Sequence, residues 1–202
     1  MAKDFRKEIG AFFSARRDPA LVRLPAIKYL MIDGRGDPAK GAEYQAAIQA
    51  LYTLVYTLKF SGKKGSRQRE MPVLPLDSLW WQAGRKVFDP RTPRSAWRWR
   101  AMLAVPGFVT EAMLNRVRKE AMAKKPLAAL RKVHLKTWKE GLSAQVLHVG
   151  PYAAERPTIE RLHEFIKEQG HKPQGRHHEI YLSDPRRTSP KKLRTIIRQP
   201  VV

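Results

Sequence analysis

The order of turns and predicted elements occurs twice in this chain, and this internal repeat is the strongest constraint on its fold. A strand, a glycine turn, a helix, two further strands and a closing proline can be followed through residues 23–108 and again through 141–202. Identity between the halves is low, so the repeat rests on element order and on turn residues such as Gly34 and Gly150. A single β-α-β-β module buries too little apolar surface to be stable alone. Two modules side by side predict an α+β fold with one antiparallel-rich sheet, helices, and a ligand groove at the pseudo-twofold junction.

The segments outside the repeat complete one domain over residues 1–202. Residues 1–22 contain an amphipathic pattern that predicts an N-terminal helix. Residues 109–140 predict a connecting helical segment, followed by a turn at Glu140-Gly141 that opens the second module. Within the first module, the clearest helix covers residues 43–59. Tyr56 lies at the edge of its apolar stripe, where a tyrosine usually caps the core but would also line any cleft beside the helix.

The most informative short stretch is a predicted strand near the C-terminus. Period two places His177, Glu179 and Tyr181 on one face, and His178 and Ile180 on the other. A carboxylate between an imidazole and a phenol indicates a base or a polar-ligand site in an aromatic cleft. The alternative interpretation is an exposed or ion-paired strand glutamate.

The repeat also predicts partners for this strand. It places Asp77 at the position equivalent to Glu179, so the groove would hold two carboxylates. Trp80 and Trp81 follow on the same predicted strand, and alternation puts only one of them in the groove wall. Which tryptophan lines the groove depends on which face of the sheet the helices cover.

The net charge of +22 is the most unusual feature of the composition. The basic residues are spread along the chain, without zinc-finger spacing, a basic zipper or an RNA-binding aromatic signature. We therefore expect contact with nucleic acid to be non-specific if it occurs.

The absence of cysteine excludes disulfides, thiolate zinc sites and cysteine nucleophiles. The six histidines show no metal-ligand spacing, so we expect neither a metal nor a cofactor. The sequence contains no secretory signal pattern and nothing that approaches a transmembrane span. These features predict a cytoplasmic protein that does not contact membranes.

Two stretches resemble the GyrI-like small-molecule-binding family, and three shorter ones support the resemblance. The long stretches are 145–152 and 177–187; the shorter ones are 193–201, 79–81 and 97–99. The similarity is to the stand-alone branch that includes cyclopropanoid cyclopropyl hydrolases, and it covers nearly the whole chain from about Phe5. It implies a duplicated β-α-β-β fold with an aromatic ligand groove around a central glutamate, which matches Glu179. Relatives often carry glutamate where this chain has Asp77.

The resemblance implies a hydrolase that detoxifies electrophilic cyclopropanoid xenobiotics. Glu179 would take a proton from a water molecule that attacks the strained ring, and His177 or a tyrosine hydroxyl would hydrogen-bond the carbonyl oxygen. The flat ligand would stack on four aromatic residues, Trp81, Tyr181, Tyr152 and Tyr56. One alternative is a non-catalytic multidrug binder in which Glu179 pairs with planar cationic drugs. Another is a gyrase-inhibitor-like interaction protein, which rests on the family name alone.

Overall fold

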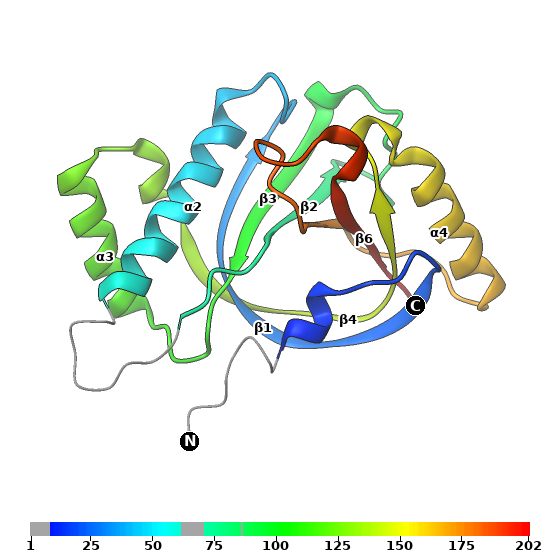
Figure 1. Cartoon of the computed structure of the whole chain (residues 1–202), viewed down its shortest axis with the longest axis horizontal. Coiled ribbons are helices and arrows are strands. Elements are labelled where there is room, and N and C mark those ends of the chain that lie inside the picture. The colour runs from blue at the N-terminus through cyan, green and yellow to red at the C-terminus, as the bar shows by residue number, and fades with distance from the viewer. Residues whose placement is uncertain (1–8, 62–70, 86) are drawn as a thin grey trace.

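Six strands form one closed sheet in the computed structural model, which describes residues 9–61, 71–85 and 87–202. The strand order is β1-β3-β2-β5-β6-β4, and all neighbours are antiparallel. The strands are β1 (Ala20–Arg35), β2 (Leu76–Gln82), β3 (Trp97–Ala104), β4 (His134–Val149), β5 (His177–Tyr181) and β6 (Arg194–Pro200). Figure 1 shows α2 (Ala42–Ser61) and α3 (Glu111–Lys124) together on one side of the sheet, and α4 (Arg156–Glu168) on the other.

The strand order reproduces the two-module repeat. The first module contributes β1-β3-β2 and the second contributes β4-β6-β5, in the same internal order. The modules meet twice, where β2 pairs with β5 and where β1 pairs with β4. In each module the first long helix, α2 or α4, follows the first strand. The prediction of an α+β fold built from duplicated β-α-β-β modules is therefore confirmed.

β1 is longer than the sequence predicted. It begins at Ala20, inside the segment 1–22 expected to be helical, because its first residues pair with β4 from Gln145 back to Gly141. Residues 1–8 of the predicted helix lie outside the described residues, and Gly10–Phe13 form a short 3-10 helix.

β4 is also a single long strand, although the sequence predicted a turn at Glu140-Gly141 between the connecting segment and the second module. Gly141 has a φ of +84°, a backbone conformation that glycine adopts without steric cost. The glycine lets β4 change direction while its pairing with β1 continues on both sides, from Lys139 to Leu142. The boundary predicted at 140/141 thus falls within one element. The rest of the connecting segment 109–140 contains α3 and the short 3-10 helix Ala128–Arg131.

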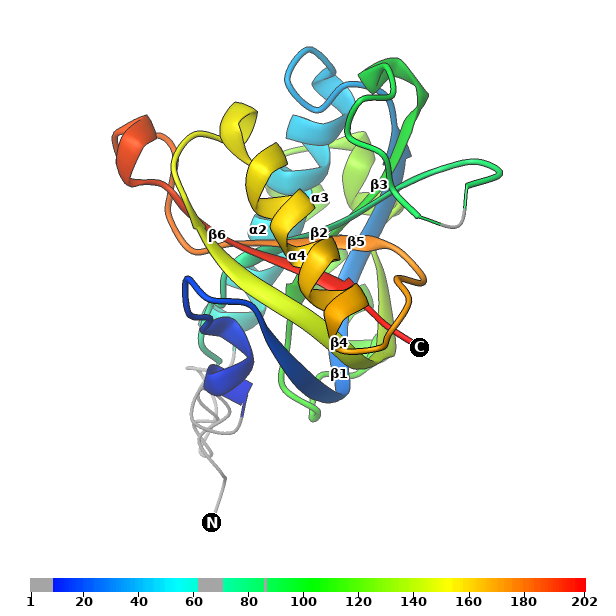
Figure 2. The ribbon, with the colours of Figure 1, turned by 90° about the vertical axis from the view of Figure 1, so that its right-hand side faces the viewer.

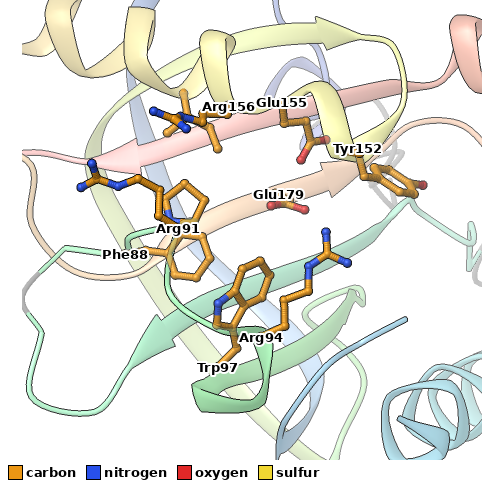
Figure 3. Close-up of a pocket in the computed structure, with 11 residues that line it drawn as sticks. Phe88, Arg91, Arg94, Trp97, Tyr152, Glu155, Arg156 and Glu179 are labelled. Carbon is orange, nitrogen blue, oxygen red and sulfur yellow. The ribbon is translucent and has the colours of Figure 1, made fainter. Parts of the chain in front are cut away.

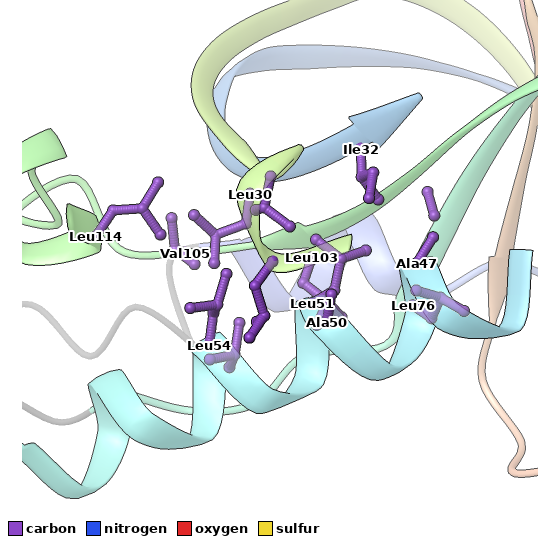
Figure 4. Close-up of a cluster of buried hydrophobic side chains, with 14 of the residues drawn as sticks. Leu30, Ile32, Ala47, Ala50, Leu51, Leu54, Leu76, Leu103, Val105 and Leu114 are labelled. Carbon is purple, nitrogen blue, oxygen red and sulfur yellow. The ribbon is translucent and has the colours of Figure 1, made fainter. Parts of the chain in front are cut away.

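The two long helices cover different parts of the outer face of the closed sheet. α2 packs Leu51 and Leu54 against β1 and β3, and Figure 4 shows these side chains meeting Leu30 and Leu103. α4 packs Leu162 and its apolar neighbours against β4 and β6, and Figure 2 shows it lying across that part of the sheet. Between the two helices, a strip of the outer face over the β2–β5 junction is not covered by either of them and is open to a ligand.

The inner face of the closed sheet has its own apolar cluster, which includes Tyr29, Met31, Leu79 and Met102.

In the described part of the chain, no helix combines the length and the apolarity needed to cross a membrane.

Candidate functional site

A pocket of about 220 Å³ opens on the outer face near the β2–β5 junction (Figure 3). One wall comes from the loop that leads into β3, and the other from the turn Tyr152–Ala154 and the first residues of α4. Both modules therefore contribute to it, as the repeat predicted for a groove at their junction.

Glu179 lies at the base of this pocket, on β5, and its carboxylate is held through both oxygens. The Tyr181 hydroxyl donates a 2.7 Å hydrogen bond to Oε2, and Nε2 of His177 lies 3.2 Å from Oε1. The His177 ring stacks on Phe88, with 5.1 Å between ring centres. A carboxylate has about four acceptor positions, so a group held by two neighbours can still accept a proton or a hydrogen bond from a ligand. This is the geometry of an oriented base.

The hydroxyl groups of Tyr181 and Tyr44 are buried beside Glu179 and help to hold it in place. Burial, together with the negative charge of Glu179, raises the pKa of Tyr181 well above its usual value, so its hydroxyl remains a neutral donor. Tyr44 of α2 approaches Tyr181 and lies 2.7 Å from Oγ of Ser78, measured from its own hydroxyl. Helix α2 of the first module thus helps to position the glutamate of the second.

Glu155 is a second carboxyl group in the pocket, and it was not among the predicted site residues. It directly precedes α4 and is 6% exposed, and its Oε1 has no hydrogen-bond partner among the described residues. Burial raises its pKa well above the usual range, and the nearby charge of Glu179 raises it further. A carboxyl group that stays protonated beside one that accepts hydrogen bonds can form an acid–base pair. No pattern in the sequence distinguished Glu155 from other acidic residues, because an acidic residue at a helix N-terminus is ordinarily explained by the helix dipole.

Aromatic side chains form the sides of the pocket. Trp97 donates its indole N–H to the carbonyl oxygen of Thr92 at 3.0 Å, and Phe88 packs against it with 4.8 Å between ring centres. Tyr152 closes the opposite side and meets Tyr181 edge-on. Phe88 and Trp97 were not predicted as site residues. Phe88 lies in a loop without periodicity, and the alternation that assigns Trp97 to a face of β3 does not say what lies against that face.

Three arginines surround the pocket, and each interacts with a carboxylate outside the pocket lining. Arg91 binds Asp89 through two hydrogen bonds, of 3.0 and 3.2 Å. Arg156 binds Glu160 at 2.8 Å. Arg94 lies 3.9 Å from the carboxylate of Asp37 and 5.6 Å from the centre of the Trp97 ring. The pocket therefore has carboxyl groups inside and a ring of paired cations around its mouth.

The structure brings together four of the predicted site residues: Glu179, Tyr181, His177 and Tyr152. Trp80 lies on the same face of the sheet as Glu179, but it is only 3% exposed and does not line the pocket. Its ring centre lies 5.6 Å from that of Trp97.

The other predicted residues lie elsewhere. Asp77 and Trp81 point to the inner face of the sheet, because Ser78 and not Asp77 is opposite Glu179 in the β2–β5 register. Tyr56 is 44% exposed on α2, where its ring stacks between Tyr52 and Phe60, and it does not line the pocket.

Asp77 instead belongs to a buried ionic cluster on the inner face. His178 lies between two carboxylates, with Nδ1 3.0 Å from Glu140 and Nε2 3.5 Å from Asp77. Arg198 lies 3.3 Å from Glu140 and also donates to Gln145. The two carboxylates predicted for one groove are thus separated by the sheet. Among the described residues, no group of three histidine, aspartate or glutamate side chains is arranged to hold a metal ion.

Comparisons with known proteins place this geometry in a family. The model of the GyrI-like small-molecule-binding domain matches residues 108–202. A solved structure of an uncharacterized conserved protein from Listeria innocua is 40% identical, with a TM-score of 0.90 and 98% of each chain covered. Two structures of hydrolases from Listeria innocua, one encoded by lin2189, are 37% and 38% identical, with TM-scores of 0.86 and 0.87 and the same coverage. A sequence comparison with curated proteins gave no match.

Proposed function

Because this chain belongs to the GyrI-like small-molecule-binding family, we propose that it binds a planar electrophile in the Glu179 pocket and hydrolyses it. The proposed substrates are cyclopropanoid compounds in which a three-membered ring is conjugated to a carbonyl group. The observation that carries the proposal is the pairing of Glu179, held as a hydrogen-bond acceptor, with Glu155, whose raised pKa favours the protonated acid. Two similar proteins from Listeria innocua are named hydrolases, which supports the same reaction class.

The proposed reaction adds one water molecule across the ring. Glu179 takes a proton from the water as its oxygen forms a bond to the less hindered ring carbon. The carbon–carbon bond of the cyclopropane breaks, and its electron pair passes through the conjugated system to the carbonyl oxygen. Glu155 donates its proton to that oxygen, which becomes a phenol. Proton exchange with solvent then restores both carboxyl groups, so atoms and charges balance.

The shape of the pocket suits a flat, uncharged arene. Trp97, Phe88 and Tyr152 offer aromatic surfaces against which such a ligand can stack. The arginines at the mouth do not favour a cationic ligand, although Glu179 and the aromatic rings could bind one. Sequestration of planar drugs without turnover is therefore the rival outcome that the experiment must separate. An interaction with gyrase stays a prediction from the family name.

The test is to follow ring opening of a spirocyclopropyl dienone by mass spectrometry in ¹⁸O-labelled water. The wild-type protein is expected to give a product that carries one labelled oxygen, over many turnovers. Glu179→Gln and Glu155→Gln are each expected to lose about 10²- to 10⁴-fold in rate, the usual contribution of a general base or acid. Fluorescence quenching of the pocket tryptophan measures binding, which we expect both variants to retain.

Glu168→Gln is the matched control, since Glu168 is an exposed carboxylate at the end of α4 and does not line the pocket. It should react at the wild-type rate. Tight binding without product in the wild type would assign the pocket to sequestration. Equal rates in the wild type and in Glu179→Gln would remove the base from the mechanism.

A further inference from the structure

One end of the inner face of the closed sheet carries a row of arginines. In the strand registers, Arg35 of β1 is opposite Arg98 of β3, and Arg98 is opposite Trp81 of β2. Neighbouring strands lie about 4.8 Å apart, so these side chains are direct neighbours. Like charges opposite one another do not stabilise a sheet, so pairing within the fold does not explain this arrangement.

Arg176 adds a third cation without a carboxylate partner. It precedes β5, and its guanidinium lies 3.7 Å from the centre of the Trp81 ring. Partial burial lowers its pKa, and the positive charge of nearby Arg100 lowers it further. Among the described residues, no carboxylate forms an ion pair with Arg35, Arg98 or Arg176.

An ion pair beside this row is already complete. Arg100 donates to both carboxylate oxygens of Asp33, at 2.6 and 2.9 Å. Asp33 also attracts Arg176 at longer range, but its single charge does not balance the four arginines at this end of the sheet. This end of the sheet therefore has an excess of positive charge on a preformed surface.

We propose that Arg35, Arg98 and Arg176, arranged around Trp81, bind the phosphate backbone of nucleic acid without reading its sequence. Planar guanidinium groups bind phosphate through paired hydrogen bonds, and an arginine stacked on an aromatic ring is fixed in orientation. The net charge of +22 attracts a polyanion from a distance, and the row gives it a place to bind. A membrane surface fits less well, because the Trp81 ring is covered by Arg176 and cannot insert into a bilayer.

The row and the pocket lie on opposite faces of the sheet. Trp81 points inward on β2, whereas Glu179 of β5 points outward with Ser78. The row can therefore be occupied while the pocket holds a ligand, and its function does not depend on the proposed hydrolysis.

The experiment measures fluorescence anisotropy of a labelled 20-nucleotide single strand of mixed sequence between 50 and 300 mM salt. Each lost phosphate contact reduces the slope of log K against log salt by about 0.7 on single strands. The triple variant R35Q/R98Q/R176Q is expected to reduce that slope by about 2. We also expect it to weaken binding at 50 mM salt by at least about tenfold.

The control removes the same charge elsewhere. R187Q/K191Q/K192Q neutralises three exposed cations beyond the opposite end of β5, and it should change the slope by less than about 0.5. Equal losses in both triple variants would assign binding to diffuse charge and overturn the proposal. So would stronger co-sedimentation with vesicles containing 30% phosphatidylserine than binding to the strand. Thermal unfolding of both variants confirms that they are folded.

Discussion

The hydroxyl of Tyr181 donates a 2.7 Å hydrogen bond to Oε2 of Glu179, two residues earlier on the same strand. A hydrogen bond to a carboxylate fixes its orientation, so Tyr181→Phe should let Glu179 turn away from the position that it needs as a base. We expect kcat near neutral pH to fall about tenfold with little change in KM, because the aromatic ring is kept. Steady-state kinetics at neutral pH measures kcat and KM.

Tyr56→Phe is the matched control for this variant. It removes the same hydroxyl from a tyrosine that is exposed on α2 and absent from the pocket lining. Its kcat and KM should match those of the wild type. A similar loss of kcat in both variants would mean that the hydroxyl of Tyr181 has no specific role in orienting Glu179.

Glu155 links activity to stability with opposite signs. Its pKa is raised by burial and by Glu179, so the folded protein keeps a proton that the unfolded chain has lost at the same pH. Stability from this residue is therefore lost as pH rises from its usual value of 4.5 through its raised pKa. Glu155→Gln should be more stable than the wild type at pH 8 but equal at pH 4, while it is less active. Urea unfolding at the two pH values measures this; a variant less stable at pH 8 would contradict it.

The inner ionic cluster predicts a loss of stability in the alkaline range. Burial alone would lower the pKa of His178, but the charge of Glu140 and the contact with Asp77 raise it to about 9. Because the folded pKa exceeds its usual value of 6.5, this stability is complete below about pH 6.5 and is lost as pH rises through 9. Its size is at most about 3 kcal/mol. The free energy of unfolding should fall over this window.

His178→Gln tests this assignment. The variant should lose the alkaline fall, and it should be destabilised by about 3–5 kcal/mol near pH 7 because it leaves Asp77 buried without a cation and Glu140 with Arg198 alone. His171→Gln, which changes a histidine outside the cluster, should keep the wild-type pH dependence. An unchanged alkaline fall in His178→Gln would assign it to another group.

Gly34 and Trp99 predict a steric effect on the first module. A Cβ at Gly34 would lie 2.1 Å from an indole carbon of Trp99, which is 1% exposed and packs edge-on against Tyr44. Gly34→Ala should therefore destabilise the protein by about 1–3 kcal/mol and lower Tm by roughly 3–10 °C. Gly107→Ala, where no atom lies within 4 Å of the added Cβ, should change Tm by less than about 2 °C. Adding Trp99→Phe should restore part of the loss; no restoration would exclude this clash as the cause.

Local periodicity predicted correctly which side chains of β5 share a face of the sheet. Alternation along one strand is a property of neighbouring residues, and it placed His177, Glu179 and Tyr181 on one face, where hydrogen bonds now join them. Alternation alone could not predict on which face of the sheet Asp77 lies. Its face relative to Glu179 depends on the register between β2 and β5, which puts Ser78 opposite Glu179. An offset of one residue in aligning the two modules exchanges the faces of every side chain, and sequence order alone does not fix that offset.

The other wall of the pocket depends on non-local folding of irregular segments. Phe88 comes from a loop, Glu155 from the turn before α4, and Trp97 from the first residue of β3. No period relates these positions to β5. The sequence therefore predicted that Glu179 shares a face with His177 and Tyr181, whereas the positions of Glu155 and of the aromatic side chains required the three-dimensional structure.

The double junction between the modules has a consequence for any attempt to divide the chain. In the undivided chain β2 is paired with β5 and β1 with β4, so none of the six described strands has a free edge. Either half produced alone would expose two edges, each with unpaired backbone N–H and C=O groups that recruit other chains. Cut within the connector at Lys125-Pro126 and expressed together, the halves should instead complement each other. The site would then report reassembly, since each half supplies residues that the other lacks.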